Sequence, residues 1–168
     1  MTGARIGIDL SRQTLTLFVG SQIESRYSIS SALKGAGEQV NSGCTPRGLH
    51  RIRAKVGAGC PLGSVFIGRR PTGEQYSAEL AEQYPQRDWI LSRILWLCGC
   101  EPGVNRLADR DTMRRYIYIH GTPDSEPMGQ PLSHGCIRMR NRDLIALFER
   151  VSCGTFVQID EVQTDESS

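Results

Sequence analysis

A period of two in the apolar residues runs through much of the chain and constrains its fold more than any other feature. Ile6, Ile8 and Leu10 alternate with small or polar residues, and apolar stretches at 14–19 and 23–29 follow after short turns. Successive side chains of a strand point to opposite faces of a sheet, so this alternation predicts strands with one buried face. The N-terminal part is therefore predicted to be a three-stranded meander, and the domain to be mainly β.

Similar patterns predict further strands, which lie at residues 50–56, 64–68, 116–119 and 154–160. The strand at 50–56 has a cationic face, formed by Arg51, Arg53 and Lys55, which is expected to face water. The apolar segment 89–97 fits either a strand or a short helix.

One stretch, at residues 142–151, has the period of an amphipathic helix, with Asn141 as its expected N-cap. Residues 30–48 consist largely of Ser, Gly, Ala, Asn and Pro with few large apolar residues, which predicts a long surface loop, and residues 69–87 are predicted to form a polar loop. Residues 1–160 are expected to form a single domain, and residues 161–168 a polar tail.

Composition excludes several classes of protein. The 168 residues include 20 basic and 18 acidic ones, so no global field would attract nucleic acid, and the longest apolar stretches are too short to span a membrane. The N-terminus shows no apolar export signal. Six cysteines in a chain that needs no disulfide framework favour a reducing compartment. We expect a cytoplasmic protein, or a periplasmic one if a signal peptide has been removed.

Reactive side chains are concentrated between residues 120 and 139, where His120, His134 and Cys136 lie among several glycines and prolines. A free thiol with a pKa near 8.5 is only about 3% ionised at pH 7, whereas a pKa of about 6 would make it roughly 90% thiolate. Such a shift would need a partly buried imidazolium or a favourable dipole beside the thiol. His120 ends a predicted strand and could supply the base.

The sequence around these residues resembles the signature of the YkuD-type L,D-transpeptidase family. Ser-His-Gly-Cys-Ile-Arg at 133–138, preceded by His120 and Gly121, carries the resemblance, and residues 45–52 are similar to the family's Thr-Pro-x-Gly segment. The resemblance covers about residues 5–160. Twelve residues separate His120 from Ser133, slightly fewer than the family pattern has.

This resemblance implies roles for individual residues. Cys136 would be the nucleophile, His120 the base that takes its proton, and the Gly121 carbonyl the group that orients the imidazole. The supporting or oxyanion-hole residues would be Ser133, His134, Gly135 and the Gly121 backbone. Arg138 would receive a substrate carboxylate.

The resemblance also implies a fold and an activity. The fold would be a YkuD-like β-sandwich of mixed sheets with one or two short helices. The enzyme would cleave the bond between meso-diaminopimelate and D-Ala in a peptidoglycan tetrapeptide or muropeptide through a thioester, without a cofactor or metal. Water as acceptor would make it a cytoplasmic L,D-carboxypeptidase of murein recycling, and carbapenems could acylate it.

Four alternatives remain open. The protein could be a periplasmic L,D-transpeptidase that forms 3,3 crosslinks, or a peptidoglycan-binding module without activity. His120, His134 and Cys136 could instead bind zinc, although no carboxylate recurs at a ligand spacing. A papain-like enzyme fits poorly, because its cysteine precedes its histidine. His50 shares a strand face with apolar residues and is predicted to be a core or rim histidine, outside the catalytic set.

Overall fold

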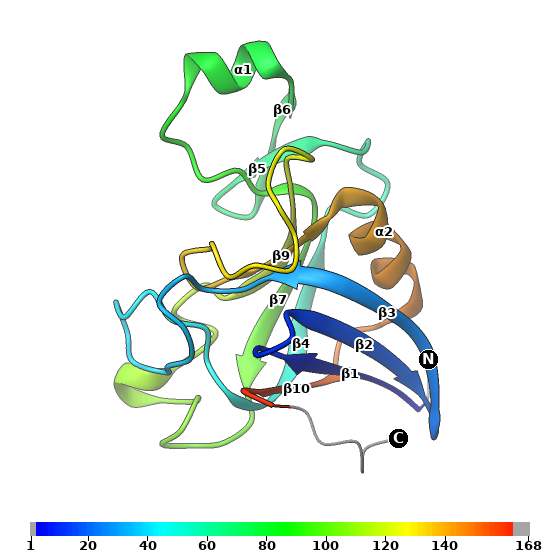
Figure 1. Ribbon diagram of the computed structural model, residues 1–168, viewed down its shortest axis with the longest axis vertical. Helices are drawn as coiled ribbons and strands as arrows, with labels where there is room; N and C mark the ends of the chain where they lie inside the picture. Colours follow the sequence, from blue (N-terminus) through cyan, green and yellow to red (C-terminus); the bar gives the residue numbers. More distant parts are fainter. Residues whose placement is uncertain (1–2, 163–168) are drawn as a thin grey trace.

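The computed structural model describes residues 3–162, in which ten strands and two α-helices are found (Figure 1). The strands are β1 (Ala4–Asp9), β2 (Thr14–Val19), β3 (Gln22–Ser30), β4 (Gly48–Val56), β5 (Ser64–Ile67), β6 (Arg70–Gln75), β7 (Leu91–Gly99), β8 (Tyr118–Thr122), β9 (Ile137–Arg140) and β10 (Phe156–Asp160). The helices are α1 (Ala78–Gln83), α2 (Asn141–Arg150) and a short 3-10 turn, η1 (Ala108–Arg110). The mainly β prediction is confirmed. Most of the expected tail, 163–168, lies outside the described residues.

The strands form one mixed sheet in the order β4-β10-β1-β2-β3-β9-β8-β7-β5-β6. Strand β4 also pairs with β7, so the part from β4 to β7 closes on itself, and β5 and β6 continue beyond it. The pairs β1–β10 and β8–β9 are parallel. In Figure 1, β5, β6 and α1 extend above the closed part of the sheet.

The core lies inside the closed sheet and under α2. The register of β1 and β2 places Ile6 opposite Leu17 and Ile8 opposite Leu15, and all four side chains are buried. Each fully buried aliphatic side chain of this size contributes about 1.5–3 kcal/mol. The apolar stripe of α2 is likewise buried against β7, β8 and β9. No helix within residues 3–162 combines the length and apolar character needed to cross a bilayer.

The prediction of a polar loop at 69–87 is wrong, because this segment holds β6 and α1. Strand β6 is mostly exposed and lies at the edge of the sheet, so no alternation of buried residues marks it in the sequence. Helix α1 has six residues and none fully buried, so it lacks an apolar period. Its N-cap is Ser77, whose Oγ accepts a hydrogen bond from the Leu80 N–H at 3.1 Å. The ambiguous segment 89–97 lies mostly in strand β7, which begins at Leu91.

The predicted N-cap role of Asn141 is also wrong. Asn141 is the first residue of α2, and its side chain instead makes tertiary contacts. Its Nδ2 donates to the Thr122 carbonyl at 3.1 Å, and its Oδ1 accepts from Ser92 Oγ at 2.7 Å. These bonds fix the start of α2 beside the end of β8.

The 30–48 segment is irregular, as predicted, but it is not a surface loop along its whole length. Ala32 and Thr45 are fully buried, and Ala32 forms a β-bridge with Ser133. The segment therefore packs directly against the Ser-His-Gly-Cys turn. Composition alone did not reveal this contact, because small polar residues suit both an exposed loop and close packing of backbone.

His50 is a core histidine, in agreement with the prediction. Its side chain is fully buried, with Nδ1 3.0 Å from the Gly48 carbonyl and Nε2 3.0 Å from Thr112 Oγ1. Burial lowers the pKa of His50 to about 4.

This histidine should make folding stability depend on pH. The unfolded chain binds a proton at His50 below about pH 6.5, whereas the folded chain does not until about pH 4. Stability is therefore fully present above pH 6.5 and falls by about 3 kcal/mol as the pH drops to 4. Urea denaturation across this range should show the loss. His50→Gln should remove the His50 part of this loss and leave a smaller one from His120, whose pKa is also lowered by burial, whereas His134→Gln, at an exposed histidine, should leave the loss unchanged.

Candidate active site

His120 lies near the middle of β8 and is 1% exposed. Its Nδ1 is 2.7 Å from the Gly121 carbonyl oxygen. A carbonyl oxygen can only accept a hydrogen bond, so Nδ1 carries the proton and Nε2 keeps a lone pair. The backbone thus holds the imidazole in the tautomer that a general base requires.

Cys136 immediately precedes β9, which runs parallel to β8 with His120 opposite Arg138. Two residues back in this register, Cys136 lies beside Tyr118, whose N–H donates to the Cys136 Sγ at 3.3 Å. Side chains alternate along a strand, so Cys136 and Arg138 share one face with His120 and Tyr118. The parallel pairing therefore brings nucleophile and base to the same face from sixteen positions apart in the chain.

The electrostatics differ from the expected ion pair. Burial of the thiol raises the pKa of Cys136 to about 12, and the Tyr118 N–H only partly offsets this. Burial likewise lowers the pKa of His120, against the opposing effect of the Gly121 carbonyl. Both shifts favour the neutral forms. The electrostatics therefore favour a thiol and a neutral imidazole in the resting site over a preformed thiolate–imidazolium pair.

The thiol proton is directed toward the backbone. Sγ donates to the Tyr116 carbonyl at 3.4 Å, and Tyr116 has a left-handed backbone with φ of 57°. Among the described residues, no hydrogen bond joins Sγ to the His120 imidazole. The S–H bond must turn from Tyr116 toward His120 before the proton can move.

A short turn fixes the backbone on either side of the thiol. Ser133 Oγ donates to the Cys136 carbonyl at 2.6 Å and accepts from the Gly135 N–H at 3.2 Å. Thr45 Oγ1 donates to the Gly135 carbonyl at 2.9 Å. Gly135 has a φ of 132°, which favours glycine. Its N–H, a predicted oxyanion-hole donor, is occupied by Ser133 in this arrangement.

Asp88 contacts two of the predicted site residues, His134 and Arg138, and no local pattern in the sequence predicts it there. One of its carboxylate oxygens is 3.1 Å from Arg138 Nη2, and the other is 3.4 Å from His134 Nδ1. Glu126 lies 3.9 Å from Arg138 Nη1. A substrate carboxylate would have to displace one of these partners to reach the terminal nitrogens of Arg138. His134 is 77% exposed at the rim.

Arg115 is a second residue that sequence reasoning missed. Its guanidinium donates to the Cys44 carbonyl at 2.6 Å and to the Gly37 carbonyl at 3.2 Å, and so braces the 30–48 segment. Its charge also acts to lower the pKa of Cys136. No sequence pattern surrounds Arg115, so its place near Cys136 is evident only from the fold.

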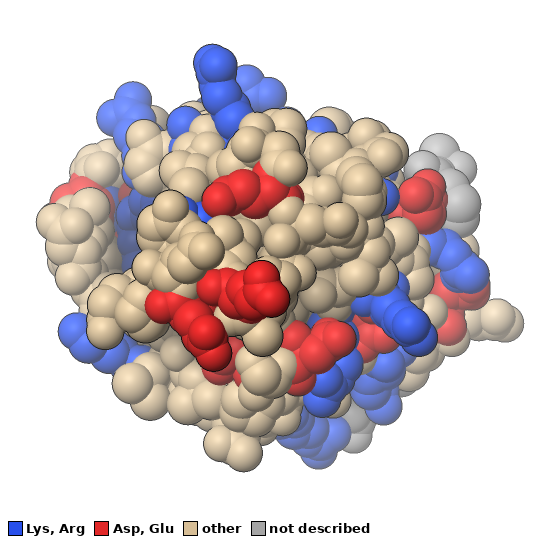
Figure 2. Space-filling model, turned by 90° about the horizontal axis from the view of Figure 1, so that it is seen from above, with Lys and Arg blue, Asp and Glu red and all other residues tan. Residues whose placement is uncertain are grey.

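The surroundings include a cavity and an acidic face. A cavity of about 690 Å³ lies between α1 and the end of β8, with Tyr76, Leu91 and Pro123 among its lining residues. Seen from the α1 side, carboxylates gather at the centre of the surface (Figure 2). Helix α1 contributes the exposed Glu79 and Glu82. No group of three or more metal-binding side chains occurs within residues 3–162.

Gly121 should not tolerate a side chain. A Cβ there would lie 2.2 Å from Asn141 Oδ1 and 2.5 Å from the Leu91 carbonyl oxygen, which is backbone and cannot easily move. Gly121→Ala should cost about 3 kcal/mol of folding stability, measured by thermal or urea denaturation. Gly129→Ala is the comparison, since φ there is 86° with open space around it, and should cost only about 1–2 kcal/mol. Equal losses would contradict the close packing at Gly121.

Solved structures share the fold at low sequence identity. An L,D-transpeptidase from Mycobacterium smegmatis is 18% identical with a TM-score of 0.59, and the match covers 94% of this chain and 58% of that one. L,D-transpeptidase 3 from Mycobacterium tuberculosis, in complex with a faropenem-derived adduct, is 15% identical with a TM-score of 0.58, covering 95% and 60%. At these identities the likeness concerns the fold.

Curated relatives match over shorter stretches. The probable L,D-transpeptidase YbiS of Escherichia coli K12 is 52% identical over 48 residues, which is 28% of this chain and 16% of the relative. The putative L,D-transpeptidase YqjB of Bacillus subtilis is 40% identical over 52 residues, or 31% and 30%. The YkuD L,D-transpeptidase catalytic domain matches residues 3–159, nearly the whole chain. The chain therefore belongs to the YkuD family of L,D-transpeptidase catalytic domains.

Proposed function

We propose that the chain cleaves the bond between meso-diaminopimelate and D-Ala in peptidoglycan tetrapeptides, with Cys136 as nucleophile and His120 as base. The observation that carries the proposal is the His120 tautomer. Its Nδ1 is held by the Gly121 carbonyl at 2.7 Å, which leaves Nε2 free to accept a proton on the face that carries Cys136. The membership of the YkuD family supplies the substrate class.

The reaction begins from neutral groups. The S–H bond of Cys136 turns from the Tyr116 carbonyl to His120 Nε2, which takes the proton as Sγ attacks the substrate carbonyl. The C–N bond then breaks, His120 gives its proton to the leaving D-Ala amine, and a thioester remains on Cys136. Because the imidazolium forms as Sγ attacks and is absent from the ground state, its attraction to the developing oxyanion adds stabilisation in the transition state.

The acceptor that resolves the thioester decides the product. With water as acceptor the enzyme is an L,D-carboxypeptidase, which would trim soluble muropeptides during murein recycling in the cytoplasm. The six unpaired cysteines support a reducing compartment, because exposed thiols such as Cys153 exchange with disulfides in an oxidising one.

Transpeptidation is the second candidate, and two observations favour it. The acidic face around α1 would attract the ammonium group of an acceptor stem (Figure 2). The curated relatives are named as L,D-transpeptidases. In this case the acceptor amine would form a 3,3 crosslink, as a periplasmic enzyme does when assembled peptidoglycan is present.

One assay separates these outcomes. The protein is incubated with a purified murein tetrapeptide, alone and with an excess of an amine acceptor, and the products are identified by mass spectrometry. Tripeptide in both conditions supports the carboxypeptidase, and crosslinked dimer with acceptor supports the transpeptidase. If neither product forms, and the wild-type protein and Cys136→Ala behave alike, the function would be that of a peptidoglycan-binding module without activity.

A further inference from the structure

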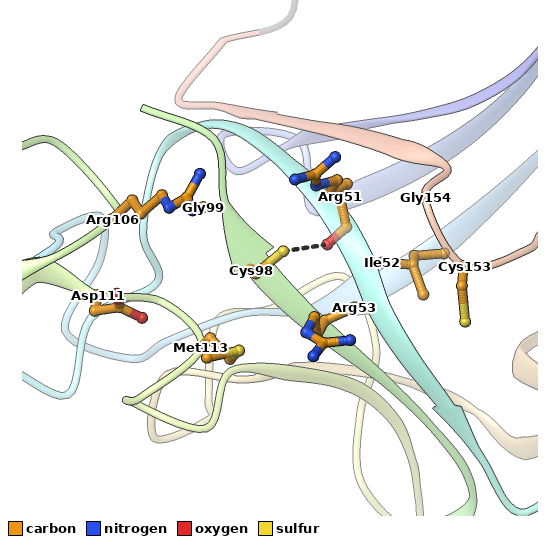
Figure 3. A pocket seen from close by; sticks show the side chains of 10 residues that line it. All are labelled: Arg51, Ile52, Arg53, Cys98, Gly99, Arg106, Asp111, Met113, Cys153 and Gly154. Carbon is orange, nitrogen blue, oxygen red and sulfur yellow. Dashed lines mark hydrogen bonds between the residues drawn. The ribbon is translucent and has the colours of Figure 1, made fainter. Parts of the chain in front are cut away.

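A cavity of about 390 Å³ lies on the outer side of the closed sheet, and none of its lining residues belongs to the catalytic set (Figure 3). Its walls come from β4, the end of β7, the segment around η1 and the turn before β10. The polar and reactive lining residues are Arg51, Arg53, Cys98, Arg106, Asp111 and Cys153. The wall is thus rich in cations and thiols, and it is built from four parts of the chain.

Two guanidiniums on β4 lie close to a thiol on β7. Arg51 lies opposite Cys98 in the β4–β7 pair, and Arg53, at an irregularity in that pairing between Ile52 and Ala54, is exposed as Arg51 is. In Figure 3 both arginines extend from β4 beside Cys98, while Arg106 reaches from the opposite wall. All three arginines are exposed.

The carboxylate in the cavity wall is held by backbone donors. Asp111 is only 7% exposed, and its two oxygens accept from the Leu107 N–H at 2.8 Å and the Arg114 N–H at 3.0 Å. The ion pairs found within residues 3–162 include none to Arg51, Arg53 or Arg106. Like charges on one face of a sheet repel, so this cluster lowers stability until an anion neutralises it.

We propose that this cavity binds a small molecule carrying two or more carboxylate or phosphate groups. Guanidinium groups recognise such oxygens with paired hydrogen bonds, and three of them around one cavity suit several anionic groups at once. The volume suits a small metabolite, and the near-zero net charge of the whole chain provides no field for a long polyanion. The site is independent of the Cys136 chemistry.

Isothermal titration calorimetry with citrate and with pyrophosphate, at physiological ionic strength, tests the proposal. Arg51→Gln/Arg53→Gln should weaken binding by at least about tenfold, the effect of losing paired charged hydrogen bonds. Arg12→Gln/Arg70→Gln removes the same net charge at exposed arginines outside the cavity lining and should change the affinity less than about twofold. Binding of one probe alone would assign the site to carboxylates or to phosphates, and binding of both supports the shared chemistry.

The Cys98 thiol in the cavity provides a second readout, independent of calorimetry. Bound citrate or pyrophosphate should slow the alkylation of Cys98 by iodoacetamide, which mass spectrometry monitors. The alkylation rate of Cys44, on the 30–48 segment, should not change. No binding of either probe to the wild-type protein would overturn the proposal. Equal weakening in the two double variants, with no protection of Cys98, would also overturn it, because binding would then follow net charge alone.

Discussion

Replacing Cys136 with serine is expected to lower kcat/KM for tetrapeptide cleavage by at least about 10³-fold, because the neutral site has no other group that can form the acyl-enzyme. Serine keeps the size and the hydrogen-bonding capacity that Cys136 uses with the Tyr118 N–H and the Tyr116 carbonyl. Its hydroxyl is far harder to deprotonate than a thiol, so His120 cannot activate it to the same degree. Release of tripeptide and D-Ala, measured by mass spectrometry, gives the rate.

Two controls make this loss specific to the nucleophile. Cys153→Ser changes an exposed cysteine and should leave turnover unchanged. A carbapenem should add one acyl group to the wild-type protein and none to Cys136→Ser, because the acyl group is attached to the Cys136 thiol. Full turnover by Cys136→Ser would show that the thioester mechanism is wrong.

Replacing His120 with asparagine is expected to lower kcat/KM by about 10²–10⁴-fold, the usual contribution of a general base. The asparagine amide can take the place of Nδ1 and donate to the Gly121 carbonyl, but it cannot accept a proton from Cys136. Urea denaturation distinguishes loss of the base from loss of the fold. His134→Gln is the matched control at an exposed histidine and should retain most of the activity.

The shifted pKa values of His120 and Cys136 predict how activity and thiol reactivity depend on pH. His120 must be neutral to act as base, and burial lowers its pKa, so activity should persist below pH 6.5 before it falls. Cys136, with a pKa raised to about 12, should show slow alkylation that rises with pH through the neutral range. A plateau of alkylation from pH 6 upward would instead reveal a thiolate–imidazolium pair.

The parts of the fold with one buried face could be predicted from the sequence. The alternation in β1 and the apolar stripe of α2 reflect burial directly. The apolar run at 116–119 predicted a strand that ends at His120, and β8 continues two residues further, to Thr122. Strand β6 and helix α1 could not be predicted, because both are largely exposed and no buried period constrains their residues. A prediction from local polarity therefore assigns such exposed segments to loops.

The catalytic motif could be found in the sequence, but its electrostatics could not. Asp88 and Arg115 act on the site from 48 and 21 positions away from Cys136, and no local pattern marks either one. The protonation states of Cys136 and His120 depend on how many atoms exclude water around them, which only the packed structure defines. The closeness of His120 and Cys136 in the motif suggested a thiolate–imidazolium pair, whereas burial favours the neutral form of each group.

The parallel pairing of β8 with β9 has a consequence for how such domains diverge. The spacing between base and nucleophile is set by ladder hydrogen bonds between Ile119, His120 and their partners on β9, and the connecting residues 123–132 do not enter that ladder. Insertions or deletions in the connection can therefore reshape the entrance without altering the catalytic geometry. The shortened interval between His120 and Ser133 is one such variation in length, tolerated because the two strands hold the chemistry in register.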